Sequence, residues 1–292
     1  MRASISRAIA VVAAGVFVLG VASTQTMAQN AMSSLAKDSQ LEVIKKRGQF
    51  KVGMTSFVPW AMRDKKGELI GFEIDVANEV AKDMEVELKL IPTQFAGIIP
   101  ALLAGTFDTI ITGIAHSPGR NLQVNFTIPY QTYGSMLVVS KKLAPNVKTV
   151  AELNHPGITI GSRRGGTGKK TIERLFPKAK VLYFDDDAQV FQDVINGNIH
   201  ATFAPKPKPL FYTAAYSDSL HMPVEGFLRG SKQFSGFAIR KGDPDFLNFL
   251  DNWIRHHQTN GWLPERNNFW FNSNNWFDQV EESKNKFAIK KK

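Results

Sequence analysis

Hydrophobic and polar residues follow two different periods in the first half of this chain. Short apolar runs typical of buried strands occur at residues 50–54, 86–92 and 108–114. Between them, residues 74–84 and 95–107 repeat apolar side chains at helical spacing. Strands that alternate with helices in this way predict parallel sheets covered by helices on both faces.

The same order of elements starts again after Lys142, with strands predicted at 158–162, 180–184 and 200–204 and helices between them. Two long apolar stretches, 135–142 and 234–242, frame this second unit. The pattern therefore predicts an α/β protein of two lobes joined by two hinge strands, with the crossings near Val139 and Phe237. A cleft between two lobes is a common place for a ligand.

The predicted boundaries divide the chain into four parts. These are residues 1–28, 29–141 (first lobe), 142–236 (second lobe) and 237–292, in which the chain returns to the first lobe and ends in a helix and a basic tail.

The first 28 residues have the composition of a secretory signal peptide. Arg2 and Arg7 precede an apolar run at 8–22, and the small residues Thr26 and Ala28 favour cleavage after Ala28. The run is shorter than the ~20 apolar residues that a spanning helix needs. The chain has no cysteine, so neither disulfides nor a lipidated cysteine is expected. The sequence predicts a free periplasmic protein.

The net charge of +10 gives little support to a nucleic-acid partner, because the basic residues are scattered along the chain. No metal-ligand spacing is present. His256 and His257 are adjacent, so they point in different directions around a helix. We expect no nucleic acid, no metal and no cofactor.

Motifs in register along residues 41–272 resemble a known family. In order, they include GELIGFEIDVANEVAKDM, FAGIIPALLAGTFDTIITGI, PGR, FTIPY, GITIGSRRGGTG and NGWLPERNNFWF. Together they resemble the periplasmic solute-binding proteins of the polar-amino-acid ABC transporter type, which are the bacterial extracellular solute-binding proteins of family 3. The resemblance implies a two-lobed Venus flytrap that closes around its ligand and docks on a membrane ABC permease.

The resemblance also implies a clasp for the ligand's carboxylate. Arg120 matches the arginine that holds it, and a guanidinium fork suits a carboxylate through two parallel hydrogen bonds. Thr167 and Gly168 match the partners from the second lobe, at the N-terminus of a predicted helix, where free N–H groups favour an anion. A phosphate-binding loop is excluded, because Arg163 stands where a glycine is required and Lys170 where Ser or Thr is required.

Other positions of the family's site depart from its pattern. Phe57 and Trp60 match aromatic positions beside the ligand, although core packing explains Trp60 equally well. After Gly113 of the TGI segment, Ala115 replaces a hydroxyl residue. Met54 and Pro205 replace two acids that hold the ligand's ammonium in relatives, while Arg163 and Lys206 add positive charge. A buried ammonium without acceptors is costly, so a plain α-amino acid is not expected.

The expected ligand is an anionic or zwitterionic small molecule. It is an organic acid with a second anionic group, or one whose alkylated nitrogen rests on Trp60 or Phe57. If Asp185, Asp186 or Asp187 replaces the missing acids, ordinary polar amino acids remain candidates. The protein is expected to be a monomeric importer component without catalysis.

Two other functions remain open at this stage. A dehydratase acting on cyclohexadienyl or arogenate-like acids uses the same fold, but it needs a placed general acid. His116, His200 and the aspartates offer no evident catalytic set. A periplasmic sensor domain would have the same sequence features.

Overall fold

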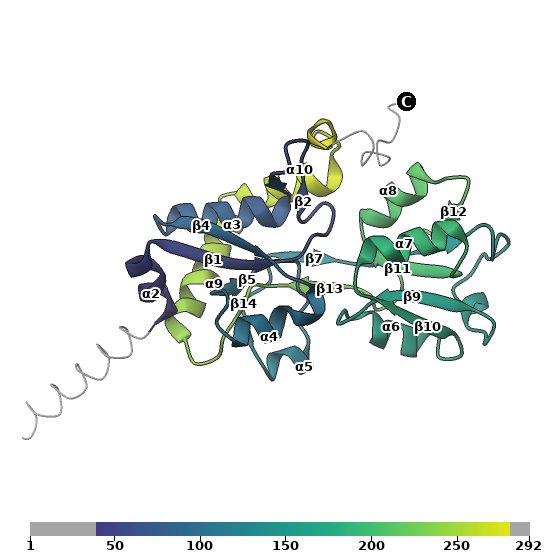
Figure 1. Cartoon of the computed structure of the whole chain (residues 1–292), viewed down its shortest axis with the longest axis horizontal. Coiled ribbons are helices and arrows are strands. Elements are labelled where there is room, and N and C mark those ends of the chain that lie inside the picture. The colour runs from purple at the N-terminus through teal and green to yellow at the C-terminus, as the bar shows by residue number, and fades with distance from the viewer. Residues whose placement is uncertain (1–38, 281–292) are drawn as a thin grey trace, which may run out of the picture.

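The computed structural model describes residues 39–280, so the expected signal peptide and basic tail lie outside the described residues. Two α/β lobes lie side by side, and two short strands run between them (Figure 1). The first lobe contains α2 (Gln40–Arg47), β1 (Gln49–Met54), β2 (Met62–Arg63), β3 (Leu69–Ile70), α3 (Phe72–Asp83), β4 (Glu87–Pro92), η1 (Phe95–Gly97), α4 (Ile98–Leu103), β5 (Thr109–Ile110), α5 (Pro118–Asn121), β6 (Asn125–Phe126), β14 (Ala238–Ile239), α9 (Pro244–Thr259), α10 (Trp262–Asn272) and η3 (Phe277–Gln279).

The first lobe is built on a five-stranded sheet in the order β4-β1-β5-β14-β6. Successive residues of a strand point to opposite faces of a sheet. Accordingly, Ile110 packs with α4 on one face, whereas Ile111 packs with α3, α9 and α10 on the other. The β1 pairings are parallel and the β14 pairings antiparallel, so the sheet is mixed rather than wholly parallel as the pattern predicted.

The second lobe repeats this arrangement around a sheet in the order β10-β9-β11-β8-β12. Val138 and Val139 of one strand again enter two different cores, one on each face. The elements of this lobe are β8 (Ser135–Ser140), η2 (Ala151–Leu153), β9 (Thr159–Arg163), α6 (Gly168–Leu175), β10 (Lys180–Phe184), α7 (Asp187–Asn196), β11 (Ala201–Pro205), α8 (Lys208–Ala215) and β12 (Leu220–His221).

The hinge is the antiparallel pair of β7 (Gln131–Tyr133) and β13 (Gln233–Ser235). The expected crossings at Val139 and Phe237 are therefore corrected. Val139 lies inside the second sheet, where β8 pairs with β11 and all six of its residues are buried. Phe237 belongs to the core of the first lobe. The second lobe thus begins with β8, several residues before the expected boundary at 142.

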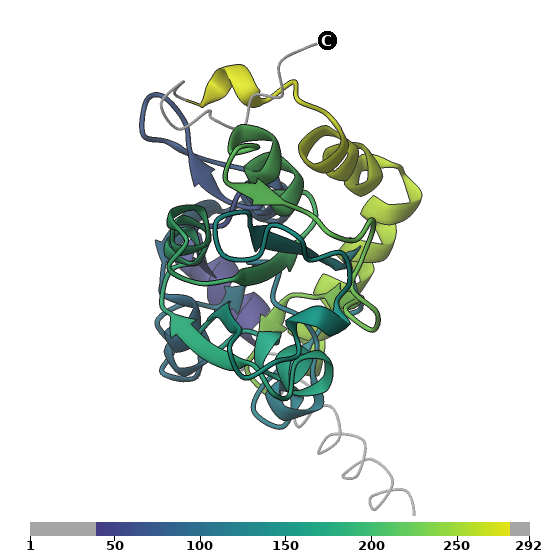
Figure 2. The ribbon, with the colours of Figure 1, turned by 90° about the vertical axis from the view of Figure 1, so that its right-hand side faces the viewer.

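Besides the two hinge strands, the C-terminal part of the chain makes a packing contact between the lobes. Seen from the side of the second lobe, α9 and α10 run along one edge of the molecule (Figure 2). The chain then turns so that Trp276 and Phe277 pack edge-on against Phe211 of α8, at centroid distances of 5.8 and 5.4 Å. None of the helices in the described part of the chain is long and apolar enough to cross a membrane.

We predict that Gly53→Ala destabilises the first lobe. A Cβ at this position of β1 would lie 2.3 Å from the ring of Phe107, a fully buried side chain. Overpacking of this kind typically costs about 1–3 kcal/mol, because the neighbouring side chains must shift. Denaturant unfolding should show the loss. Gly97→Ala is the control, since its Cβ would meet nothing within 4 Å, and an equal loss in both variants would contradict the packing argument.

Candidate ligand-binding site

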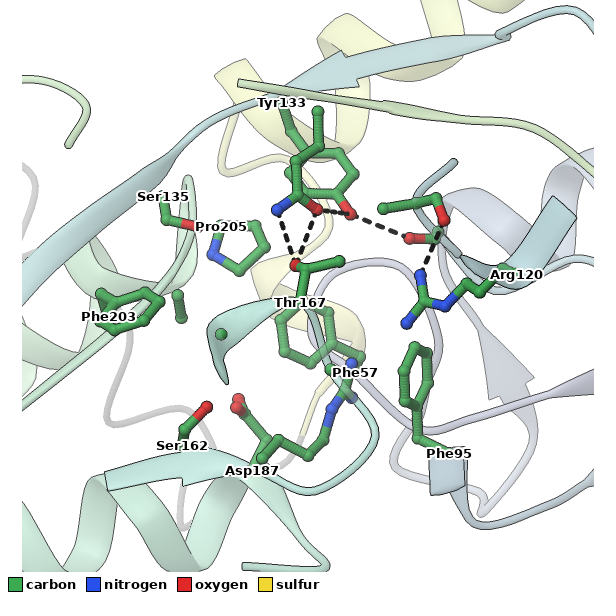
Figure 3. Close-up of a pocket in the computed structure, with 17 residues that line it drawn as sticks. Phe57, Phe95, Arg120, Tyr133, Ser135, Ser162, Thr167, Asp187, Phe203 and Pro205 are labelled. Carbon is green, nitrogen blue, oxygen red and sulfur yellow. Dashed lines mark hydrogen bonds between the residues drawn. The ribbon is translucent and has the colours of Figure 1, made fainter. Parts of the chain in front are cut away.

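A small cavity of about 70 Å³ lies between the two lobes, next to the hinge strands (Figure 3). Both lobes and the hinge contribute to its wall, as a closing flytrap requires. Its lining residues are Phe57, Phe95, Gly113, Ala115, Arg120, Tyr133, Ser135, Ser162, Arg163, Gly166, Thr167, Gly168, Asp187, Phe203, Ala204, Pro205 and Gln233.

Arg120 reaches the cavity from the first lobe and touches the second. It lies in α5, a short helix that begins at Pro118 and is capped by Ser117. One terminal nitrogen donates to the carbonyl of Ala115 at 2.7 Å, and the other donates to the carbonyl of Gly165 at 2.9 Å. Gly165 belongs to the second lobe, so this guanidinium connects the lobes directly. Burial lowers the pKa of Arg120 from its ordinary value.

The N-terminus of α6 faces the cavity through Gly166, Thr167 and Gly168. Gly168 is required by close packing, because a Cβ there would lie 2.2 Å from the hydroxyl of Ser162. No described side chain caps this helix end. Its free N–H groups and positive dipole end therefore favour an anion in the cavity.

Hinge residues connect the helix end to the first lobe. Gln233 of β13 donates to the Thr167 hydroxyl at 2.6 Å, and Tyr133 of β7 donates to the carbonyl of Gly113 at 3.2 Å. The Tyr133 hydroxyl also lies 3.1 Å from the side-chain oxygen of Gln233. Burial raises the pKa of Tyr133 to about 12, so the phenol remains a neutral donor.

Arg163, at the end of β9, also lines the cavity. Its guanidinium carbon lies 4.0 Å from the ring centre of Phe95 and 5.0 Å from that of Phe57, both in the first lobe. Within residues 39–280 the guanidinium makes neither a hydrogen bond nor an ion pair. Burial lowers the pKa of Arg163, and the nearby Asp187 counteracts this effect.

The three consecutive aspartates have different positions and partners. Asp185 is exposed and pairs with Arg164 at 2.8 Å, and Asp186 accepts a hydrogen bond from the N-terminus of α7. Asp187 alone lines the cavity, where it forms an ion pair with Lys208 of α8. Lys208 is only 4 % exposed, and its ammonium lies 4.7 Å from the ring centre of Phe57.

Eight of the expected site residues line the cavity, and three do not. Met54 is fully buried beside Ala61 and Ile74 in a small core, and Trp60 is 1 % exposed. Lys206 lies outside the lining, and Lys208 is the lysine beside the cavity. Met54, Trp60 and Lys206 therefore do not line this cavity, and for Trp60 the alternative of core packing agrees with its burial. The eight residues that line the cavity are Phe57, Gly113, Ala115, Arg120, Arg163, Thr167, Gly168 and Pro205.

Sequence reasoning did not find Phe95, Tyr133, Ser162 or Gln233 among the lining residues. Phe95 opens a segment that the sequence pattern predicts only as a helix, and the two hinge residues belong to no local motif. Their position at the bottom of the cleft follows from the pairing of β7 with β13, and the predicted hinge stretches 135–142 and 234–242 contain neither residue.

A buried network supports the wall of the cavity at Gly113. Tyr130 donates to the carboxyl of Glu73 at 2.7 Å, and the Gly113 N–H donates to the Tyr130 hydroxyl at 3.3 Å. The ring of Trp60 lies against Gly113, where an added Cβ would be 3.0 Å from it. Burial raises the pKa of Glu73 to about 8. At neutral pH this carboxyl group is therefore protonated and adds no negative charge to the site.

Comparisons with known proteins show the family to which the chain belongs. Residues 50–273 match the model of the bacterial extracellular solute-binding proteins, family 3. The chain is 29 % identical to the L-cystine-binding protein TcyJ of Escherichia coli (strain K12), over 87 % of this chain and 94 % of that protein. It is 24 % identical to the cyclohexadienyl dehydratase of Pseudomonas aeruginosa, over 80 % of this chain and 87 % of the enzyme.

Among solved structures, a putative ABC-transporter binding component of Wolinella succinogenes complexed with lysine is similar. Its TM-score is 0.73 at 37 % identity, with 80 % of this chain and 99 % of that chain covered. The two-lobed fold of this chain is thus that of a solute-binding protein. The chain belongs to the bacterial extracellular solute-binding proteins of family 3.

We predict that Glu73 makes the stability of the protein depend on pH. In the unfolded chain this carboxyl ionises near its ordinary pKa of 4.5, whereas the folded protein keeps the proton up to about pH 8. Between these values unfolding releases a proton, so stability should fall as pH rises, by about 1.4 kcal/mol per pH unit.

Glu73→Gln cannot ionise and should remove this slope, as measured by denaturant unfolding from pH 5 to 8. Glu87→Gln makes the same substitution at an exposed position of β4 and keeps Glu73, so its slope should match the wild type. A Glu73→Gln variant that retains the full slope would contradict the assignment.

Proposed function

We propose that this chain is the periplasmic substrate-binding component of an ABC importer and that it takes a small carboxylate-bearing solute between its lobes. The family membership and the relatives that bind amino acids and cystine support the transport class. Export through a cleaved N-terminal signal peptide and action as a monomer are parts of the same proposal.

The observation that carries the proposal is the position of Arg120 opposite the N-terminus of α6. A cationic fork from one lobe and an uncapped helix end from the other meet at one cavity. Both groups stabilise the same kind of ligand atom, a carboxylate oxygen. A carboxylate held by both lobes would stabilise the closed form over the open one.

The enzyme alternative receives less support from the residues of the cavity. A dehydratase needs a general acid within hydrogen-bond reach of its substrate. His116 lies in a different cavity beside Phe126, and His200 accepts a hydrogen bond from Thr159 on a neighbouring strand. Asp187 is the carboxyl group in the described cavity lining, and Lys208 already occupies it in an ion pair.

We predict that Arg120→Ala lowers affinity for the ligand that a thermal-shift screen of carboxylic acids identifies. Loss of the fork leaves a buried carboxylate unpaired, which costs about 2–5 kcal/mol of binding. Arg120→Lys should also bind poorly, because an ammonium cannot reproduce the two parallel hydrogen bonds.

Calorimetry would measure both variants, and Arg255→Ala on the exposed face of α9 is the control for loss of an arginine. Near-native affinity of Arg120→Ala would remove this residue from the site and the carboxylate from the proposal.

We also predict that ligand binding closes the lobes about the β7–β13 pair. Small-angle X-ray scattering should show a smaller radius of gyration at saturating ligand than without ligand, because the cleft closes. A mixture with a carboxylic acid that does not bind serves as the control. An unchanged radius at saturation would contradict a flytrap mechanism.

A further inference from the structure

The charges around the cavity do not balance. Arg120 and Arg163 line it, and Asp187, the carboxylate among the described lining residues, is neutralised by its ion pair with Lys208. Glu73, which lies behind Gly113, is protonated at neutral pH. Two positive charges therefore lack a counter-charge among the residues that line the cavity, and Asp186, the other acid near Arg163, is exposed and forms no ion pair with it.

The two guanidinium groups also differ in the hydrogen bonds that they make. Arg120 donates to two backbone carbonyls, of Ala115 and Gly165. The Arg163 guanidinium makes no hydrogen bond within residues 39–280, although the side chain is half-buried between the rings of Phe57 and Phe95. A guanidinium has five N–H donors. None of its nitrogens is among the fully buried polar atoms without a partner, so the free donors are open to the cavity that Arg163 lines. A ligand that displaces water from them must offer acceptors, because a buried donor left without one is costly.

The neighbouring acids do not meet this requirement. Asp185 pairs with Arg164 on the surface, Asp186 caps α7, and Asp187 pairs with Lys208. Each of the three carboxylates therefore has a partner elsewhere, and none lies within ion-pair distance of Arg163.

We propose that the ligand is a small dianionic acid whose first carboxylate lies at Arg120 and the N-terminus of α6, and whose second anionic group is held by Arg163. This inference rests on the proposed function and names the class of solute. Both guanidinium carbons lie within 5.4 Å of the ring centre of Phe95, so one short molecule can reach both. A second anion also neutralises the remaining positive charge of the closed cavity.

The proposal separates this chain from relatives whose ligand is cationic. A lysine or arginine ligand brings its own positive side chain into a cavity that already holds two unmatched guanidinium groups. Like charges in a poorly solvated site repel strongly. Dianions should therefore be preferred over cationic amino acids at this site.

The experiment compares dicarboxylates with their half-amides. Malonate, succinate, glutarate and adipate are titrated calorimetrically into the full-length mature protein, each beside its monoamide, which has the same shape and one charge fewer. L-Glutamate, L-glutamine, L-lysine and L-arginine complete the panel. The best dicarboxylate should bind at least about 30-fold more tightly than its half-amide, because the half-amide leaves Arg163 without an anion.

The informative variant is Arg163→Gln, with Arg164→Gln as its matched control. The two positions are adjacent and lose the same charge, but Arg164 is exposed and paired with Asp185. Arg163→Gln should remove the preference for the dicarboxylate over the half-amide, and Arg164→Gln should keep it. Without ligand, thermal unfolding of Arg163→Gln should occur at or above the wild-type temperature, which also shows that the variant folds.

The outcomes distinguish this inference from the proposed function. Equal affinity for a dicarboxylate and its half-amide, or a preference that survives Arg163→Gln, would overturn the dianion proposal and leave a carboxylate-binding protein. Tight binding of L-lysine or L-arginine that improves in Arg163→Gln would do the same. If no carboxylic acid of the panel binds, and Arg120→Ala changes nothing, the proposed function itself fails.

Discussion

Two positive charges meet in the cleft when the lobes are closed, and the closed form of this protein depends on how they are neutralised. Arg120 belongs to the first lobe and Arg163 to the second, and both lie against the ring of Phe95. Two like charges in a poorly solvated site repel each other, because water screens them less there. Closure around an empty cleft carries this cost, whereas closure around an anion turns it into attraction.

The repulsion between the two arginines depends on closure, because each arginine is held by a different lobe. Each arginine is fixed to its own lobe, Arg120 by the short helix α5 and Arg163 by the end of β9. The two lobes move relative to each other about β7 and β13, which carry Tyr133 and Gln233 into the floor of the cavity. The wall at Gly113 is supported from behind by Trp60, Tyr130 and Glu73. The first lobe supplies one wall of the cavity and the second lobe the other. The space for the ligand is therefore defined only when the lobes are closed.

Local sequence motifs predicted those site residues whose positions are determined by their neighbours in the chain. Arg120 lies in the short helix α5 and Thr167 stands at the start of α6, so neighbouring residues determine where both are placed. The hinge was misplaced because residues 135–140 are apolar on both faces, and such a run is compatible with a connecting strand or a central one. Only the long-range pairing of β8 with β11 distinguishes the two, and that pairing has no signature in the strand itself.

The direction of individual side chains was the least predictable feature. Trp60 follows Phe57 by three residues, yet its ring enters the core and donates to Gln131, while Phe57 lines the cavity. Lys206 and Lys208 differ by two positions, and Lys208 is the one that is buried beside Asp187. Both choices depend on packing partners more than 15 residues away. The sequence predicts which segment lies near the cavity, whereas tertiary contacts determine which residue of that segment lines it.

Selectivity at this site follows from counting charges more than from the shape of the cavity. The fold is shared with a lysine complex at a TM-score of 0.73, so the architecture by itself favours neither cations nor anions. The Asp187 carboxylate would attract a cationic ligand, but it already forms an ion pair with Lys208. On the dianion proposal, Lys208 disfavours cationic ligands by occupying Asp187, and Arg163 attracts anions through the donors that it leaves free. A repulsive element and an attractive element, both in the second lobe, favour the same class of ligand.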